Sequence, residues 1–472
     1  METDVEQPVV IESKTFRDRI ATVDEKGKRK WVFAQKPKGR FYNARTYVSW
    51  FFFLLFFTLP FIYVKGRPLF LFNIPEAKFI LFGQVFWPQD FFIFGLTMVT
   101  TIVFVILFTA AFGRLFCGWV CPQTIFMEMF FRKIEYFIEG DASAQRLLAK
   151  SPWDTEKILK KTTKHIVFYS LSFIVANFFL AYIIGMKELW SIVTEPVSEN
   201  IGGLFSIAVF SAVFYAVFAH FREQVCTVVC PYGRLQGVLL DRNSMIVAYD
   251  HKRGEPRGKL NKFAELGKGD CIDCMACVRV CPTGIDIRNG TQMECVGCTA
   301  CIDACDAIMT KVSKPTGLIR YASENNISEG TKLRYTGRMK FYTVLLVLLA
   351  SLLTFFLVTR HDVSATIMRT PGMLYQERGT DSVSNLYNIK IANKTIDKVN
   401  LELRLEGTEG KIETIGGRSI LVKEEGQGSG SFFVVLPATA IKKRSTELNI
   451  GLYGNGEKIS VIKTKFLGPV GE

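Results

Sequence analysis

The sequence predicts a polytopic α-helical membrane protein that carries a cysteine-rich cytoplasmic insert and a C-terminal β-sandwich. Three observations lead to this fold class. Apolar runs of bilayer length recur along the chain, all 12 cysteines fall into short-spaced groups, and the final segment alternates between polar and apolar residues as strands do. Phe contributes 41 of the 472 residues and the mean hydropathy is +0.20, which is too apolar for an ordinary soluble protein of this charge.

Five runs are predicted to be transmembrane helices, because each is of bilayer length and has no charged residue in its middle. They are residues 46–64, 91–112, 166–185, 202–221 and 341–358. Residues 68–87 are nearly as apolar, but Glu76 and Lys78 interrupt them. This stretch is therefore predicted to be an interfacial or re-entrant segment and not a sixth span.

The basic residues predict the orientation in the membrane. The segment before the first span holds eleven Lys or Arg, the loop 65–90 holds three, the loop 113–165 holds nine, and the loop 186–201 holds one. Since basic loops stay in the cytoplasm, we expect a multi-pass protein of the bacterial inner membrane with a cytoplasmic N-terminus and a periplasmic C-terminus. This topology accounts for the net charge of +14, and no groove-reading motif supports nucleic-acid binding.

The chain is predicted to divide into five parts. They are a cytoplasmic N-terminal segment 1–45, a four-helix membrane core 46–240, a cytoplasmic domain 241–340, a fifth transmembrane helix 341–358 and a periplasmic β-domain 375–472. The β-domain is expected to be a sandwich of about seven strands, with GQGSG and YGNGE as turns. It contains no Cys, which excludes a disulfide scaffold.

Eight cysteines form a doubled run in the cytoplasmic domain. Cys271, Cys274, Cys277 and Cys281 are followed by Cys295, Cys298, Cys301 and Cys305 at the same spacing. This is the spacing of bacterial two-cluster ferredoxins, in which the fourth Cys of each run ligates the other cluster. The predicted metal sites are therefore two 4Fe-4S clusters, one held by Cys271, Cys274, Cys277 and Cys305 and the other by Cys281, Cys295, Cys298 and Cys301.

The alternatives for this motif are weaker. Zinc also binds paired cysteines, but zinc sites rarely use three Cys at two-residue intervals with a fourth three residues further on, twice over. Disulfides are excluded because the cytoplasm is reducing. Asp306 stands where the ferredoxin pattern has Pro after the last Cys, which affects the turn and not the ligands.

The remaining four cysteines form two copies of a Cys-x-x-x-Cys-Pro motif. Cys117 and Cys121 follow the second predicted span, and Cys226 and Cys230 follow the fourth. The repeat indicates a duplicated two-helix unit, and each thiol pair is expected on one face of a helix that ends or kinks at the Pro. Such thiols either bind Cu(I) or carry electrons by thiol–disulfide chemistry. The alternative is that these cysteines are only small buried apolar residues. That role would not require the pair, its spacing and the following Pro to be repeated.

The order of these parts resembles the CcoG/FixG/RdxA family of cytochrome c oxidase accessory proteins, which are membrane polyferredoxins. The resemblance covers the chain from about residue 46 to the end. It implies an immunoglobulin-like C-terminal domain and an oxidoreductase that reduces Cu(II) to Cu(I) for assembly of a cbb-type oxidase. The catalytic, copper-binding residues that it implies are Cys117, Cys121, Cys226 and Cys230. The implied partners are the lipid bilayer, copper ions, a cytoplasmic electron donor, a copper-transporting ATPase and oxidase assembly factors.

Two other functions stay open at this point. Membrane ferredoxins of the NapH and NosR type also combine Cys-x-x-x-Cys-Pro pairs with two-cluster inserts, and they pass quinol electrons to periplasmic reductases. The final span and the β-domain favour the accessory-protein interpretation. The third interpretation is a non-enzymatic assembly scaffold with structural clusters. No Gly-rich nucleotide fingerprint occurs in the sequence, so a reaction with NAD is not expected.

Overall fold

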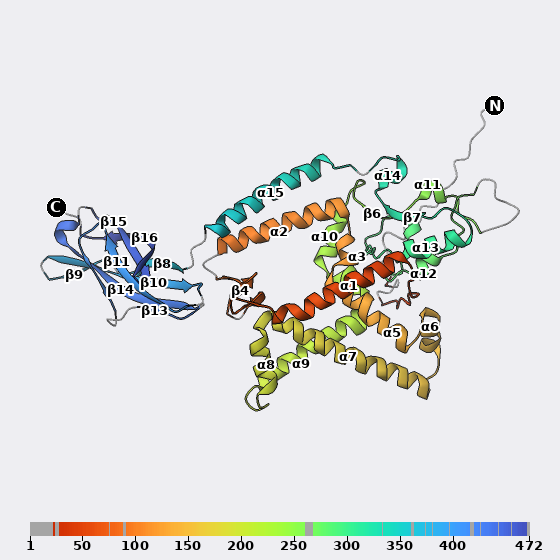
Figure 1. The fold of residues 1–472 in the computed structure, drawn as a ribbon, viewed down its shortest axis with the longest axis horizontal. Coiled ribbons are helices and arrows are strands. Elements are labelled where there is room, and N and C mark those ends of the chain that lie inside the picture. Colours follow the sequence, from red (N-terminus) through yellow and green to blue (C-terminus); the bar gives the residue numbers. More distant parts are fainter. Residues whose placement is uncertain are drawn as a thin grey trace. The chain divides into compact units, whose positions relative to one another are not determined.

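The chain forms two compact units in the computed structural model, Met1–Ile62 with Val99–Leu348 and Tyr63–Met98 with Leu349–Glu472 (Figure 1). Residues 1–21 and 24–27 of the predicted N-terminal segment lie outside the described residues. The structure describes residues 22–23, 28–74, 76–87, 91–259, 268–332, 334–359, 363–372, 374–379, 381–395, 397–415, 420–424, 426–441, 443–454 and 456–469.

Five helices of the described chain are long and apolar enough to cross a membrane, which confirms the predicted polytopic fold. They contain α1 (Arg40–Thr58), α2 (Phe91–Phe112), α7 (Thr155–Ile184), α9 (Ile201–Ala216) and α15 (Gly337–Val358). Three of them, α1, α7 and α15, begin several residues earlier than their apolar runs. In α7 the side chain of Asp154 caps the helix by accepting a hydrogen bond from the Lys157 backbone N–H, so a polar first turn precedes the apolar run.

Aromatic rings pack the membrane core of the first unit, in which α7 lies against α9 (Figure 1). Phe131 stacks on Phe218 with ring centroids 4.4 Å apart and meets Phe168 edge-on at 5.0 Å. Phe53 of α1 meets Phe126 at 4.9 Å. Because lipid tails are as apolar as side chains, close packing of this kind, and not removal from water, holds spans together.

Short helices connect the spans. They are α3 (Leu115–Trp119), α4 (Pro122–Thr124), a π-helical segment Ile125–Phe131, α5 (Arg132–Ile138), α6 (Ala142–Lys150), α8 (Met186–Thr194), two further π-helical segments Val217–Phe221 and Val225–Val229, and α10 (Pro231–Leu239). Single π-helical turns often mark functional sites; here one follows the first Cys-x-x-x-Cys-Pro motif, one precedes the second, and one contains Cys226.

An antiparallel pair of strands closes the cysteine-rich domain. In this pair β6 (Ile246–Tyr249) lies beside β7 (Ile319–Ala322), and the segment between them carries α11 (His251–Gly254), α12 (Ala276–Arg279) and α13 (Ala300–Lys311); α14 (Glu324–Ser328) follows β7. Apolar side chains such as Ile287, Ile302 and Ile319 pack around the cysteines.

Residues 68–87 form strands, and the prediction that they are not a sixth span is confirmed, whereas their interfacial or re-entrant position stays a prediction. The strands β3 (Phe70–Asn73), β4 (Lys78–Leu81) and β5 (Gln84–Phe86) pair antiparallel, and a two-stranded pair, β1 (Tyr63–Val64) and β2 (Arg67–Pro68), precedes them. Phe82 and Gly83 have φ of 51° and 74°, which is the left-handed backbone that a tight β4–β5 turn needs. Because the strands pair, their backbone N–H and C=O groups form hydrogen bonds with one another.

The C-terminal domain is the predicted β-sandwich. One sheet has the order β12 (Lys411–Thr414), β14 (Gln427–Pro437), β10 (Ser382–Asn393) and β8 (Val363–Arg369), with β9 (Gln376–Arg378) also on β10; the other has β13 (Ile420–Val422), β11 (Val399–Glu406), β15 (Ser445–Gly454) and β16 (Glu457–Leu467). The fully buried Tyr387, Phe432, Ile450 and Phe466 belong to the core of the sandwich.

The sandwich has nine described strands, two more than expected. YGNGE lies at the junction of β15 and β16, as predicted, but GQGSG is not a turn because it opens β14 and pairs with β10. Close packing explains these glycines: a Cβ at Gly428 would lie 2.9 Å from a methyl group of Val422. Glycine marks this strand because a neighbouring side chain approaches it closely.

Candidate metal centres

The eight cysteines of the insert gather into two groups. Burial raises the pKa of the Cys305 thiol to about 12, and the next influences include Cys277, Cys274 and Cys271. Burial also raises the pKa of Cys301, and there the neighbours are first Cys298, Cys295 and Cys281 and then Cys277. The two groups thus have the membership that the spacing predicts, and they lie next to each other. The assignment of each thiol as a ligand stays a prediction.

The two cysteine loops share an uncommon backbone. In the first loop, Asp273 and Met275 on either side of Cys274 have φ of 52° and 58°. In the second, Gly297 and Thr299 on either side of Cys298 have φ of 68° and 62°. Left-handed residues in such an order turn successive N–H groups toward one concave side, a backbone arrangement that binds anions, including iron–sulfur clusters.

The second group also lines a common pocket. Cys281, Cys295, Cys298 and Cys301 face this pocket together with Cys277 of the first group. In the part of the chain that the structure describes, no three His, Cys, Asp or Glu side chains converge closely enough to share one metal ion. The residues fit a four-iron cluster, which spreads its thiolates over four metals and supplies single electrons when bound.

The Cys-x-x-x-Cys-Pro motifs do not lie within one continuous helix, so the prediction of two thiols on one helical face is wrong. Cys117 lies in α3, whereas Cys121 has extended dihedral angles (φ −59°, ψ 123°) and caps α4, whose first residue is Pro122. Cys230 repeats this backbone (φ −70°, ψ 114°) in front of α10. A residue before Pro avoids the helical region, so each second Cys stands at a helix break.

Tertiary contacts bring the two motifs together. Burial raises the pKa of Cys226 to about 12, and Cys121, Cys117 and Cys230 raise it further. Burial raises the pKa of Cys117 to about 11, with Cys121 and Cys230 acting in the same direction. All four thiols therefore lie near one another although the motifs are far apart in the sequence.

Each motif also receives a polar neighbour from the helix that follows the other one. The Gln236 amide of α10 donates a hydrogen bond to the Cys117 sulfur at 3.2 Å. The buried Thr124 hydroxyl of α4 lies toward Cys226, without a full hydrogen bond to any described residue, and lowers its pKa. Sequence reasoning missed both residues, because nothing in the local pattern pairs segments so distant.

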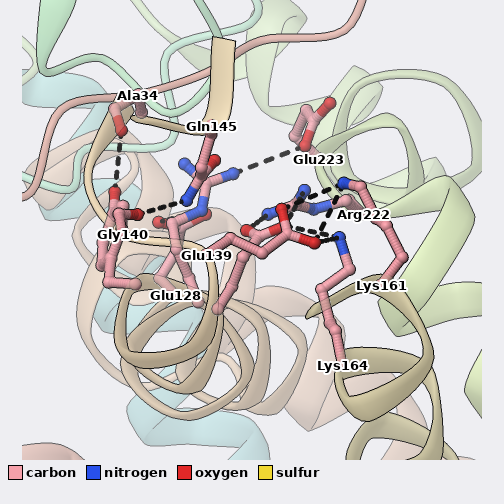
Figure 2. Close-up of polar contacts among 12 residues, drawn as sticks. Ala34, Glu128, Glu139, Gly140, Gln145, Lys161, Lys164, Arg222 and Glu223 are labelled. Carbon is pink, nitrogen blue, oxygen red and sulfur yellow. Dashed lines mark hydrogen bonds and ion pairs between the residues drawn. The ribbon is translucent and has the colours of Figure 1, made fainter. Parts of the chain in front are cut away.

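A buried network of charges holds the two repeats together (Figure 2). Arg222, just before the second motif, pairs with Glu135 of α5 at 2.6 Å, and Arg132 lies 3.6 Å from Glu223. Lys164 of α7 pairs with the same Glu135 at 3.2 Å. Burial alone would raise the pKa of Glu135, but Arg222, Lys164 and Arg132 outweigh it and lower the pKa to about 2.

The first motif touches the second cysteine group directly. A Cβ at Gly118 would lie only 2.3 Å from the carbonyl oxygen of Gly297, so two backbones meet there. Arg45 of α1 bridges the same contact by donating to the carbonyl oxygens of Gly118 and Cys298, both at 2.9 Å. Arg114 donates to the carbonyl oxygens of Cys295 and Gly233, both at 3.0 Å. The thiol site and the predicted cluster are therefore neighbours.

The cysteine-rich domain also caps the first span. The Asp303 carboxylate of α13 accepts hydrogen bonds from the backbone N–H groups of Phe41 at 3.1 Å and Tyr42 at 2.8 Å. Gly39, with φ of 153°, is required here because a Cβ would lie 2.3 Å from Asp303 Cγ. The first turn of α1 thus rests on the cluster-bearing domain.

The fold and its cysteines define a multi-pass membrane iron–sulfur protein with a two-cluster insert and an immunoglobulin-like domain. Family models agree: the 4Fe-4S dicluster domain matches residues 221–324, a 4Fe-4S binding domain matches 93–138, and the IG-like fold at the C-terminal of FixG matches 353–469. The match over 93–138 includes Cys117 and Cys121.

Curated relatives extend this likeness over most of the chain. Protein RdxB of Cereibacter sphaeroides is 33% identical over 82% of this chain and 86% of its own length. Protein RdxA of the same organism is 32% identical over 78% and 80%, and the nitrogen fixation protein FixG of Rhizobium meliloti is 34% identical over 66% and 60%. The chain belongs to the FixG/RdxA family. It is an iron–sulfur electron-transfer protein and an oxidoreductase of that type.

Proposed function

We propose that this protein is a cupric reductase of the inner membrane, which reduces Cu(II) to Cu(I) at Cys117, Cys121, Cys226 and Cys230. The Cu(I) would serve the assembly of a cbb-type cytochrome c oxidase. Each Cu(II) ion is the substrate and takes up one electron. After each transfer, a cytoplasmic electron donor reduces the oxidised cluster again.

The observation that carries this proposal is the backbone contact between Gly118 and Gly297. It sets the first thiol motif against the loop that bears Cys295 and Cys298, so the path between the electron source and the copper site is short. Soft thiolates prefer Cu(I) to Cu(II), and a site of four thiols therefore favours the reduced ion. Because buried Cys117 is protonated at neutral pH, copper binding must displace its proton.

The test is a double variant, Cys117→Ser with Cys226→Ser, in the full chain purified without oxygen. We expect the iron content to be unchanged, copper binding to be lost and Cu(II) reduction by the dithionite-reduced protein to fall at least tenfold. Val228→Ser is the matched control, since it introduces the same hydroxyl within the second motif and leaves all four thiols in place. Unchanged copper binding and Cu(II) reduction in the double variant would contradict the proposal. The protein would then be a membrane electron carrier that acts on another substrate.

The proposal includes a cytoplasmic cluster domain and a periplasmic β-domain. The charge of the loops supports this orientation. A reporter that is active only in the periplasm should work when fused after Thr359 and fail when fused at Asp270, and a cytoplasmic reporter should give the reverse. Periplasmic activity at Asp270 would overturn the orientation.

A further inference from the structure

Two buried arginines contact the backbone of the second cysteine group. Arg45 and Arg114 are 4% and 8% exposed, and neither has a carboxylate within ion-pair distance among the described residues. Their donors go instead to backbone carbonyl oxygens, including those of Cys298 and Cys295. The Nε of Arg114 is buried and finds no hydrogen-bond partner in the described part of the chain. Two positive charges thus remain uncompensated beside this group.

Both charges lie at the backbone of the predicted cluster ligands. Arg45 donates to the Cys298 carbonyl oxygen at 2.9 Å, and Arg114 donates to the Cys295 carbonyl oxygen at 3.0 Å. Two carboxylates oppose these charges: Glu294 is next to Cys295 in the chain, and Glu128 is paired with Arg132 at 3.4 Å. The balance around the second group is positive.

The first cysteine group has the opposite surroundings. Its nearest cation, Arg288, is paired with both Asp286 at 2.6 Å and Asp273 at 2.5 Å. Asp306 directly follows the predicted ligand Cys305, so its carboxylate adds a negative charge next to this group. Arg40 lies 3.7 Å from Asp306, but its side chain is largely exposed, so water screens its charge. The balance around the first group is negative.

Reduction of an iron–sulfur cluster adds one negative charge to a buried site. Net charge and hydrogen bonds around the ligands therefore set its reduction potential, and a nearby cation raises it. Interactions between buried charges are screened far less than those at the surface, so the two arginines act strongly.

We infer that Arg45 and Arg114 raise the reduction potential of the cluster at Cys281, Cys295, Cys298 and Cys301 above that of the cluster at Cys271, Cys274, Cys277 and Cys305. The electron then resides preferentially on the side of the thiol site, because the same arginines bind the backbone at Gly118 of the first motif and at Gly233, two residues after the second. This consequence rests on the proposed function, whereas the order of the potentials does not.

The experiment is an EPR-monitored redox titration of the full chain, purified without oxygen and free of copper. The wild-type protein should show two midpoint potentials. Arg45→Gln and Arg114→Gln should each lower the higher midpoint and leave the lower one in place. Asp306→Asn should do the reverse and raise only the lower midpoint. A tenfold change in the one-electron equilibrium corresponds to a shift of 59 mV, and each arginine variant should reach that size.

Controls separate tuning from damage. Arg45→Lys and Arg114→Lys keep the charge and should shift the higher midpoint less than the Gln variants, while iron content reports whether each variant still folds. Arg338→Gln removes a cation that bonds only to Leu239 and pairs with Asp241, and it should move neither midpoint. The inference is overturned if the wild type shows one shared midpoint, or if the arginine and Asp306 variants shift the same midpoint. Since no copper is present, a failed Cu(II) reduction assay leaves this result unaffected.

Discussion

The two cysteine-rich regions of this protein are built in different ways. In the insert, each loop is predicted to contribute three closely spaced cysteines to one cluster and its fourth to the other, so the backbone near Met275 and Thr299 sets most of the site locally. In the membrane core, each motif contributes only two thiols, and the site exists because contacts such as Arg222–Glu135 join the repeats. The first site is encoded by local spacing and the second by tertiary packing, so the two should fail for different reasons.

The largest expected effect is on the local site. Cys298→Ser removes one thiolate ligand and should cut the iron content from about eight atoms per chain to about four, because two four-iron clusters are expected. Cys117→Ser is the matched substitution in the other region and should leave the iron content unchanged. Iron and sulfide analysis with EPR of the reduced protein measures both. Two zinc ions per chain in place of iron, or equal iron loss in both variants, would break the comparison.

The next effect concerns the buried network. Glu135→Gln should lower the stability of the membrane core by about 3–5 kcal/mol, since Arg222 and Lys164 lose their buried partner. Glu156→Gln is the control: Glu156 is exposed and pairs with Lys160, so its loss should cost less than about 1 kcal/mol. Thermal unfolding in detergent, followed for each variant, measures the difference. Equal losses in the two variants would mean that the network does not hold the repeats.

The pH dependence of stability tests the same buried network and needs no variant beyond Glu135→Gln. Because the folded pKa of Glu135 is about 2, against an ordinary 4.5, its contribution to stability is present above about pH 4.5 and is lost as the pH falls toward 2. The gap in melting temperature between wild type and Glu135→Gln should therefore shrink over that range. A gap that stays constant down to pH 2 would show that the charge of Glu135 contributes nothing.

The smallest effect sharpens the boundary between the two regions. Gly118→Ala forces a Cβ against the Gly297 carbonyl oxygen and should cost about 1–3 kcal/mol while slowing Cu(II) reduction several-fold. Gly202→Ala in α9 is the control, since no atom lies within 4 Å of its added Cβ, and it should change neither quantity. Normal reduction by Gly118→Ala with intact clusters would show that this contact is not on the electron path.

Sequence reasoning succeeded where the signal was local. Apolar length located the spans, although α7 starts at Thr155 because a capped polar turn extends it beyond the bilayer-length run. Alternation located the sandwich, but Gly428 and Gly430 resemble turn residues while they occupy a strand, since only the packing against β13 explains them. The strands at residues 68–87 cannot be recognised in the sequence, because an apolar hairpin and an interfacial or re-entrant segment have the same composition.

The candidate thiol site was only half visible in the sequence. The repeated cysteines suggested that the two motifs work together, but Gln236, Arg45 and Arg114 carry no pattern that links them to thiols. Each reaches its partner across more than seventy positions of the chain, as in the bond from Arg45 to Gly118. Such contacts follow from the packing of helices, which no single-sequence periodicity encodes.

The cap on α1 has a consequence for the order of synthesis. The two backbone N–H groups at the start of the first span bond to Asp303, which leaves the ribosome 262 positions after Phe41. During translation the first helix is therefore inserted with an open end, and it is closed only when α13 forms around the adjacent cysteines. Until α13 has been made, the two N–H groups of Phe41 and Tyr42 can bond only to water, so the start of the first span is completed by a segment from the far side of the cysteine-rich domain.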